Sequence, residues 1–159
     1  MISIRLATRA DVGLVASLIR GLAEYGRLAD QVTMTEELLE RHLFEEPRAA
    51  EVVIAEVDGE TAGFALFFST FSTFLGRPGI YLEDLFVLPD YRGHGVGLAL
   101  LRHLAGLCRE RGCGRLEWSV LDWNVDAIRF YERLGARPTA GWTVYRLAGP
   151  ALERLATIS

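Results

Sequence analysis

The chain has 159 residues, of which 50% are hydrophobic and 24% are charged, which is the composition of a globular protein and excludes a disordered chain. The formal net charge of −4 argues against nucleic acid as the main partner and mildly favours a cationic small molecule. At this length we expect one domain, residues 1–159.

The N-terminal third is predicted to hold a strand and two helices. Residues 2–7 alternate apolar and polar side chains, which is typical of a strand. From Asp11 to Leu22, apolar residues recur at helical spacing. Thr33 and Glu36 have the spacing of a capping box, which predicts a second helix that ends near Phe44.

The middle of the chain is rich in β-branched and aromatic residues. Residues 51–57 and 61–69 flank Asp58-Gly59, which is a strong signal for a tight hairpin. We expect a long loop from Thr70 to Gly79 and then a strand from Ile80 to Leu88.

The remaining residues predict alternating helices and strands. We expect a helix over Gly95–Arg111, a strand over 115–123 and a helix that Asn124 caps and that ends at Leu134. A last strand over 142–148 and a short terminal helix from Pro150 follow. The element order βααβββαβαβ, before that terminal helix, predicts a mixed α/β fold.

Several classes of site are excluded or disfavoured by composition. All 17 basic residues are arginine, so the chain has neither a P-loop lysine nor a Schiff-base lysine. Its three histidines are scattered, so we expect no metal site. We expect the two cysteines, Cys108 and Cys113, to be reduced structural thiols of a cytoplasmic protein, and the apolar runs are too short for a membrane span.

The most informative stretch, "YLEDLFVLPDYRGHGVGLALL", joins an apolar strand to a glycine-rich turn and a helix start. A dinucleotide fingerprint fails because its third glycine would fall at Leu98, and an ordinary turn would need only one glycine. The glycines expose backbone N–H groups at the positive end of a helix, and Arg92 adds donors, so this stretch predicts a pyrophosphate site. The turn comprises Arg92, Gly93, His94, Gly95, Val96 and Gly97.

This R-x-x-G-x-G pattern resembles the acetyl-CoA motif of the GCN5-related N-acetyltransferase (GNAT) superfamily. A second stretch, "DWNVDAIRFYERLGA", resembles the superfamily's other signature, an Asn at a helix start before F-Y-x-x-x-G-[FA]. "IYLEDLFVLPDYRGHGVG", "VLDWN" and "LAEYGRLADQ" resemble the diamine (spermidine/spermine-type) acetyltransferases, and especially their thialysine N-ε-acetyltransferase relatives. The resemblance implies a mixed central sheet with splayed strands, flanked by helices.

It also implies which residues bind acetyl-CoA, the cosubstrate. The backbone of the splayed strand would bind pantetheine and polarise the acetyl carbonyl, and the glycine turn would bind the pyrophosphate. Residues at a later helix start would complete the site. These three groups are Leu85, Phe86 and Val87; Gly93 to Leu98; and Asn124, Val125, Asp126 and Ala127.

Two residues match the catalytic groups of the family. An amine with a pKa near ~10.4 is protonated at pH 7, so a base must accept its proton. Glu83 matches that base, and strand periodicity puts it on the face of Leu85 and Val87. The competing interpretation is a solvated Glu83, with Asp84 on the opposite face as the base. Tyr131 matches the general acid that protonates the CoA thiolate, although a tyrosine on a helix is more often a core residue.

The acceptor site is implied less sharply. Tyr25 and Trp142 match amine-site aromatics, although both are equally consistent with core positions. Glu117, Trp118 and Ser119 match a strand segment that lines the substrate site in polyamine-acetylating members.

Acidic residues that polyamine-specific members carry are missing here. Gly26 and Ala29 follow Tyr25, with Asp30 retained, and Ala140 precedes Gly141-Trp142. A shorter amine such as thialysine, a lysine-like molecule or a diamine therefore fits better than spermine.

The resemblance also implies a homodimer, to which the aromatic run from Phe67 to Phe74 would supply surface. Two alternatives stay open. One is an acetyltransferase of protein N-termini or side chains, for which the loop Thr70–Gly79 would cover or line a peptide groove. The other is a non-catalytic CoA-binding module, against which the presence of both Glu83 and Tyr131 argues.

Overall fold

The structure is a computed structural model that describes residues 1–158. The chain forms two compact units, Met1–Leu121 and Asp122–Ser159. The first unit holds the sheet and three α-helices. Its elements are β1 (Ile2–Leu6), α1 (Val12–Tyr25), α2 (Glu36–Phe44), β2 (Glu51–Val57), β3 (Glu60–Ser72), β4 (Arg77–Val87), α3 (Val96–Arg111) and β5 (Arg115–Trp118).

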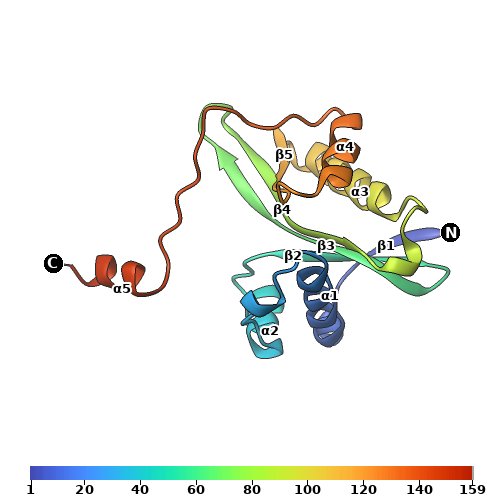
Figure 1. Cartoon of the computed structure of the whole chain (residues 1–159), viewed down its shortest axis with the longest axis horizontal. Helices are drawn as coiled ribbons and strands as arrows, with labels where there is room; N and C mark the ends of the chain where they lie inside the picture. The colour runs from blue at the N-terminus through green and yellow to red at the C-terminus, as the bar shows by residue number, and fades with distance from the viewer. Residues whose placement is uncertain (159) are drawn as a thin grey trace. The chain divides into compact units, whose positions relative to one another are not determined.

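The sheet has five strands in the order β1-β2-β3-β4-β5. The first three pairings are antiparallel, whereas β4 and β5 are parallel. Helices α1 and α2 lie on one face of this sheet and α3 lies on the other (Figure 1). The expected mixed, helix-flanked sheet is confirmed.

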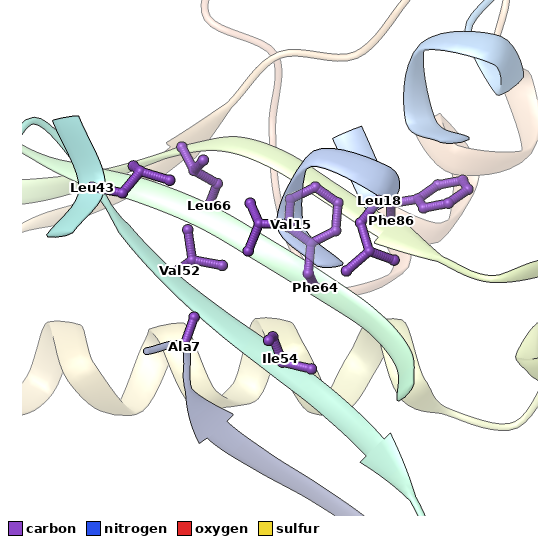
Figure 2. Packing of buried hydrophobic residues seen from close by; sticks show 9 residues of the cluster. All are labelled: Ala7, Val15, Leu18, Leu43, Val52, Ile54, Phe64, Leu66 and Phe86. Carbon is purple, nitrogen blue, oxygen red and sulfur yellow. The ribbon is translucent and has the colours of Figure 1, made fainter. Parts of the chain in front are cut away.

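The face under α1 and α2 carries a cluster of buried apolar side chains (Figure 2). Val15 and Leu18 of α1 pack there over Phe64 of β3, which is 0% exposed. The full cluster is Ala7, Val15, Leu18, Leu43, Val52, Ile54, Phe64, Leu66 and Phe86. The buried residues Val53 and Ala65 alternate with this set along β2 and β3, so the strands are buried on both faces.

One glycine allows β3 and β4 to approach closely. A Cβ built on Gly63 would lie 2.4 Å from the backbone oxygen of Phe86, a distance that no side chain tolerates. Gly63 therefore allows the first residues of β3 to lie close to the last residues of β4.

Most of the expected elements of the first unit form, with shifted ends. The Asp58-Gly59 hairpin forms with positive φ at both residues, as a tight turn between twisted strands requires. The cap of α2 is Thr35, whose side chain accepts from Leu38 N–H, so the prediction of Thr33 was two residues early.

The predicted lengths of one loop and one strand in this unit were wrong. The long loop expected from Thr70 to Gly79 is a short turn, because β3 continues to Ser72 and β4 already begins at Arg77. The strand expected over 115–123 ends at Trp118, where its pairing with β4 also ends.

The second unit contains α4 (Val125–Arg133) and α5 (Gly149–Thr157). Asn124 caps α4 by accepting from Ala127 N–H at 3.3 Å, as predicted. The strand expected over residues 142–148 does not form. Within residues 1–158 that segment pairs with none of the five strands, and a strand exists only through its pairing.

Candidate active site

The sheet opens between β4 and β5. The parallel pairing joins Gly79 to Arg115 and ends where Leu82 meets Trp118. Beyond Leu82, β4 continues to Val87 with only β3 beside it. Backbone groups on the other side of β4 therefore have no strand partner in the described chain, which is the splay expected from the sequence.

The direction of the backbone groups along this free stretch can be assigned. Leu88 N–H donates to the carbonyl of Ala62 on β3 at 2.8 Å. Since these directions alternate along a strand, the N–H and C=O groups of Phe86 also face β3, and those of Leu85 and Val87 face the opening. Leu85 and Val87 are thus the backbone positions suited to an extended pantetheine arm, whereas Phe86 contributes its side chain to the core.

The glycine turn follows β4 and opens α3. Gly93 and Gly95 have φ angles of 79° and 84°, which a residue with a Cβ rarely adopts. A Cβ at either position would meet no atom within 4 Å, so the space around the turn is open. Gly95 is the N-cap of α3, with no side chain capping the helix, so the first N–H groups of α3 are suited to an anion. His94 lies between these glycines and is exposed.

Arg92 lies at the start of this turn, and its side chain contacts β4 and α1. Its Nε donates to the carbonyl of Val87 at 3.0 Å. Its guanidinium carbon lies 4.7 Å from the ring centre of Tyr25 and 5.6 Å from that of Phe86. Arg92 therefore connects the end of β4 with Tyr25, the last residue of α1.

A β-bulge separates the two carboxylates of β4. Leu66 pairs with Asp84, whereas the next residue, Phe67, pairs with Leu82, so Glu83 is the extra residue. The alternation used to assign Glu83 to the face of Leu85 is interrupted there and does not fix its direction.

The two carboxylates differ in burial. Glu83 is exposed, whereas Asp84 lies on the face of Leu66 and is half-buried. Burial, with a smaller contribution from the nearby charge of Glu83, raises the pKa of Asp84 to about 6. Asp84 is therefore a carboxyl that titrates close to neutral pH, unlike an ordinary surface aspartate.

Tyr81 ties β4 to the residues expected to line the acceptor site. Its hydroxyl and the Oγ of Ser119 are 2.5 Å apart, and its ring lies 5.3 Å from that of Phe68. Glu117 pairs directly with Tyr81 in the sheet, and Trp118 pairs with Leu82.

Tyr81 was not among the predicted site residues, and Asp84 was considered only as the alternative to Glu83 as the base. Both lie within the stretch "YLED", but whether an apolar strand carries its polar residues inward or outward depends on a bulge that leaves no pattern in the sequence.

Tyr25 and Gly26 end α1 beside β4. The rings of Tyr25 and Phe86 are 6.4 Å apart, and Tyr25 is 43% exposed, so it is not a core residue. A Cβ on Gly21, one turn earlier, would lie 3.0 Å from the ring of Phe86, which shows how closely α1 packs on this part of β4.

The other predicted site residues belong to the second unit. Asn124, Val125, Asp126 and Ala127 form the cap and first turn of α4. Tyr131 lies on the same helix, half-buried, with its ring 5.6 Å from that of Phe130. Trp142 is 80% exposed in the segment that forms no strand, so within its own unit it is not a core residue.

Residues 1–158 contain neither a candidate metal cluster nor a candidate membrane span. No three His, Cys, Asp or Glu side chains gather there as a metal ion would require. No helix in this part of the chain has the length and apolarity to cross a membrane.

Comparison with known proteins identifies the fold and its relatives. The sequence model of the acetyltransferase (GNAT) family matches residues 16–136. The thialysine N-epsilon-acetyltransferase of Bos taurus is 39% identical over 166 residues, which cover 98% of this chain and 97% of that protein. The L-ornithine N5-acetyltransferase of Arabidopsis thaliana is 32% identical, over 96% of this chain and 86% of its own length.

Two solved structures have a fold similar to that of this chain. An integron cassette protein of V. cholerae superimposes with a TM-score of 0.81 at 29% identity, over 99% of this chain and 98% of that one. A ribosomal-protein-alanine N-acetyltransferase from Brucella melitensis gives a TM-score of 0.73 at 26% identity, over 92% of this chain and 99% of its own.

Proposed function

Because the chain belongs to the acetyltransferase (GNAT) family, we propose that it transfers the acetyl group of acetyl-CoA to a primary amine of a small molecule, by direct attack of the amine on the thioester. The observation that carries this proposal is the opening of the sheet beyond Leu82, followed at once by the open glycine turn. Backbone groups for an extended arm and N–H groups for a pyrophosphate thus follow one another along the chain.

Acetyl-CoA supplies an activated acyl group, and the residues of the chain bind it and move two protons. Leu85 and Val87 would hold the pantetheine arm and polarise the acetyl carbonyl, and the turn Gly93 to Leu98 would hold the pyrophosphate. As the new C–N bond forms and the C–S bond breaks, the amine must lose a proton and the thiolate must gain one. We assign the first proton to Glu83 and the second to Tyr131.

Asp84 is the competing base. Its raised pKa, about 6, lies near the pH at which a general base is most effective. Glu83→Gln and Asp84→Asn variants separate the two assignments, since only loss of the base should lower kcat about 100-fold or more. The amine concentration must be saturating, so that a change in amine binding is not read as a change in chemistry.

The acceptor is proposed to be a short amine of the thialysine or ornithine type. Two relatives named for those substrates match nearly the whole chain. Tyr25, Trp142 and the β5 residues Glu117 and Trp118, with Ser119 after them, are its proposed contacts. The missing acidic residues near Tyr25 and before Trp142 disfavour a long polycation such as spermine.

The experiment that tests this function is acetyl-CoA turnover against a panel of amines, with product masses read for each. The panel holds thialysine, ornithine, lysine, putrescine, spermidine, spermine and short peptides. We expect the highest kcat/KM for a short amine, and a kcat/KM for spermine equal to or above that for thialysine would overturn this choice. Activity on peptides alone would assign the chain to protein acetylation, and CoA binding without turnover would make it a binding module.

We further infer that both compact units form one catalytic domain, residues 1–159, since the family match runs from residue 16 to 136 and includes residues of both. The free thiols of Cys108 and Cys113 suit a reducing compartment, which supports action in the cytoplasm.

A homodimer is proposed as well. Phe71 and Phe74 are 66% and 90% exposed, and Val144 and Tyr145 are more than nine-tenths exposed, at 93% and 92%. Phe67, which was expected to join such a surface, is only 1% exposed and belongs to the core. Light scattering at micromolar concentration tests the dimer, and a clean monomer would refute it.

A further inference from the structure

Arg92 makes two kinds of contact with other parts of the first unit. Its Nε donates to the Val87 carbonyl, which is the last residue of β4. Its guanidinium lies over the ring of Tyr25, which is the last residue of α1. Arg92 thus contacts the last residue of β4 and the last residue of α1, and its side chain joins the two elements at their ends.

These contacts leave the guanidinium able to bind an anion. A stacked guanidinium uses its face, whereas its N–H groups point outward in the plane of the group. Only Nε is engaged with Val87, so the stack on Tyr25 does not compete with donation from the other nitrogens to a phosphate oxygen. One side chain can therefore hold the cofactor and the aromatic ring together.

Tyr25 lies where α1 ends and the chain turns. It is 43% exposed at the end of its helix, and Arg27, two residues later, has a φ of 62° as the chain turns away. The ring of Phe86, 6.4 Å away, is the other ring that Arg92 covers. A cation placed over an aromatic ring is attracted to it, so Arg92 favours the position of the Tyr25 ring seen here.

We propose that Arg92 is a positioning residue that couples the acceptor side of the site to the cofactor side. Binding of the pyrophosphate at the turn fixes Arg92, and Arg92 then fixes Tyr25 and the end of α1. The coupling is reciprocal, so a ligand held by Tyr25 tightens CoA binding to the same extent. This inference rests on the proposed function for the identity of the two ligands, but its first test needs only CoA.

The first test is hydrogen–deuterium exchange of the full-length protein, read on peptides that cover residues 20–28, with and without CoA. In the wild type we expect CoA to slow exchange at the end of α1 about 5-fold, the lower end of typical coupling between sites. Arg92→Lys keeps the charge but loses the planar face and the Nε donor, so CoA should leave exchange there unchanged. Tyr25→Leu removes the ring that Arg92 covers and should behave as Arg92→Lys.

The matched control is Arg102→Lys, an exposed arginine on α3, which should leave the CoA effect intact. Each variant is assayed at CoA saturation, confirmed by a CoA titration, so that weaker CoA binding is not mistaken for lost coupling. If CoA still slows exchange at residues 20–28 in saturated Arg92→Lys, Arg92 is only a pyrophosphate ligand and the proposal is wrong. An unchanged end of α1 in the CoA-bound wild type would overturn it equally.

The second test measures thialysine affinity with and without CoA, which cannot react. CoA should tighten thialysine binding about 5-fold in the wild type and not at all in Arg92→Lys. A wild type that acetylates no amine refutes the proposed function, while the exchange experiment still decides the role of Arg92. Conversely, a wild type that acetylates amines with no coupling refutes this inference alone.

Discussion

The two compact units differ in how their apolar residues are used. The first unit, Met1–Leu121, holds every fully buried side chain of the described core, and its strands are buried on both faces. Residues 122–158 of the second unit contain no buried residue, although they carry Trp142, Val144 and Tyr145. The first unit thus has its own core, whereas the second has helices of nine residues, which are marginal without packing.

The proposed catalytic residues therefore lie partly in a unit with a buried core and partly in a unit without one. Glu83, Asp84 and the strand edge are held by a sheet and its core, so substitutions there act on stability and on activity together. Tyr131 and the cap of α4 depend on a helix whose unit buries nothing by itself. Substitutions in the second unit should therefore change activity or association before they change the stability of the fold.

The largest effect is expected for Gly63→Ala in the first unit. The added Cβ would lie 2.4 Å from the Phe86 backbone oxygen, so β3 and β4 must separate, and we expect a loss of at least about 3 kcal/mol of unfolding free energy. Urea unfolding measures this loss of unfolding free energy. Gly106→Ala in α3 is the matched control, since nothing lies within 4 Å of its Cβ and Ala favours a helix by about 1 kcal/mol. Equal stability of the two variants would contradict the close packing of β3 on β4.

Much of the first unit was predictable because its local signals agree with its packing. The Asp58-Gly59 hairpin and the glycine turn before α3 depend on neighbouring residues, and both formed, as did the cap of α4 by Asn124 in the second unit. The splay between β4 and β5 was implied by the family resemblance and is confirmed by the end of pairing at Leu82.

The failures have a common physical cause. The bulge at Glu83 and the extension of β3 through Ser72 depend on pairing between strands, which adds no signal to either strand alone. The absent strand at residues 142–148 fails for the same reason, because its alternating pattern names no partner. The roles of Glu83 and Tyr131 remain predictions that only activity can test.

The next largest effect is expected for Tyr131→Phe in the second unit. This substitution should lower kcat without a comparable change in stability. Removing a general acid lowers kcat by about 100-fold or more, whereas loss of one hydroxyl from a half-buried ring should shift Tm little. Steady-state kinetics at saturating amine and a thermal melt measure the two quantities. Tyr145→Phe removes the same hydroxyl from a residue that is 92% exposed and should change neither. A full kcat in Tyr131→Phe would remove Tyr131 from the mechanism.

Asp84→Asn should reveal a pH-dependent effect on the stability of the first unit. Its folded pKa, about 6, lies above the ordinary value of 3.8, so the folded state favours the protonated form. Ionisation of Asp84 therefore costs stability as pH rises from about 4 to 6, by about 3 kcal/mol when complete. The neutral Asn should be more stable than the wild type at pH 8 and no different at pH 3.

Urea unfolding at several pH values provides the measurement, and Asp90→Asn is the control. Asp90 is exposed just after β4, so its replacement should change the unfolding free energy little. If Asp84→Asn destabilises the protein at pH 8, the carboxylate makes a favourable interaction in the folded state that outweighs its burial.

The smallest effect on folding is expected for Val144→Asp, and it is the change that best tests the comparison between the units. Val144 is 93% exposed, so in a monomer the substitution should alter unfolding free energy by no more than about 0.5 kcal/mol. If the segment instead covers a second copy, the charge should dissociate the dimer and lower Tm more at high than at low protein concentration. Light scattering beside the melts distinguishes the two, with Phe74→Asp as the parallel variant at the β3–β4 turn. If the dimer persists in Val144→Asp but dissociates in Phe74→Asp, the interface lies on the first unit. Association would then not account for the exposed apolar residues of the second unit.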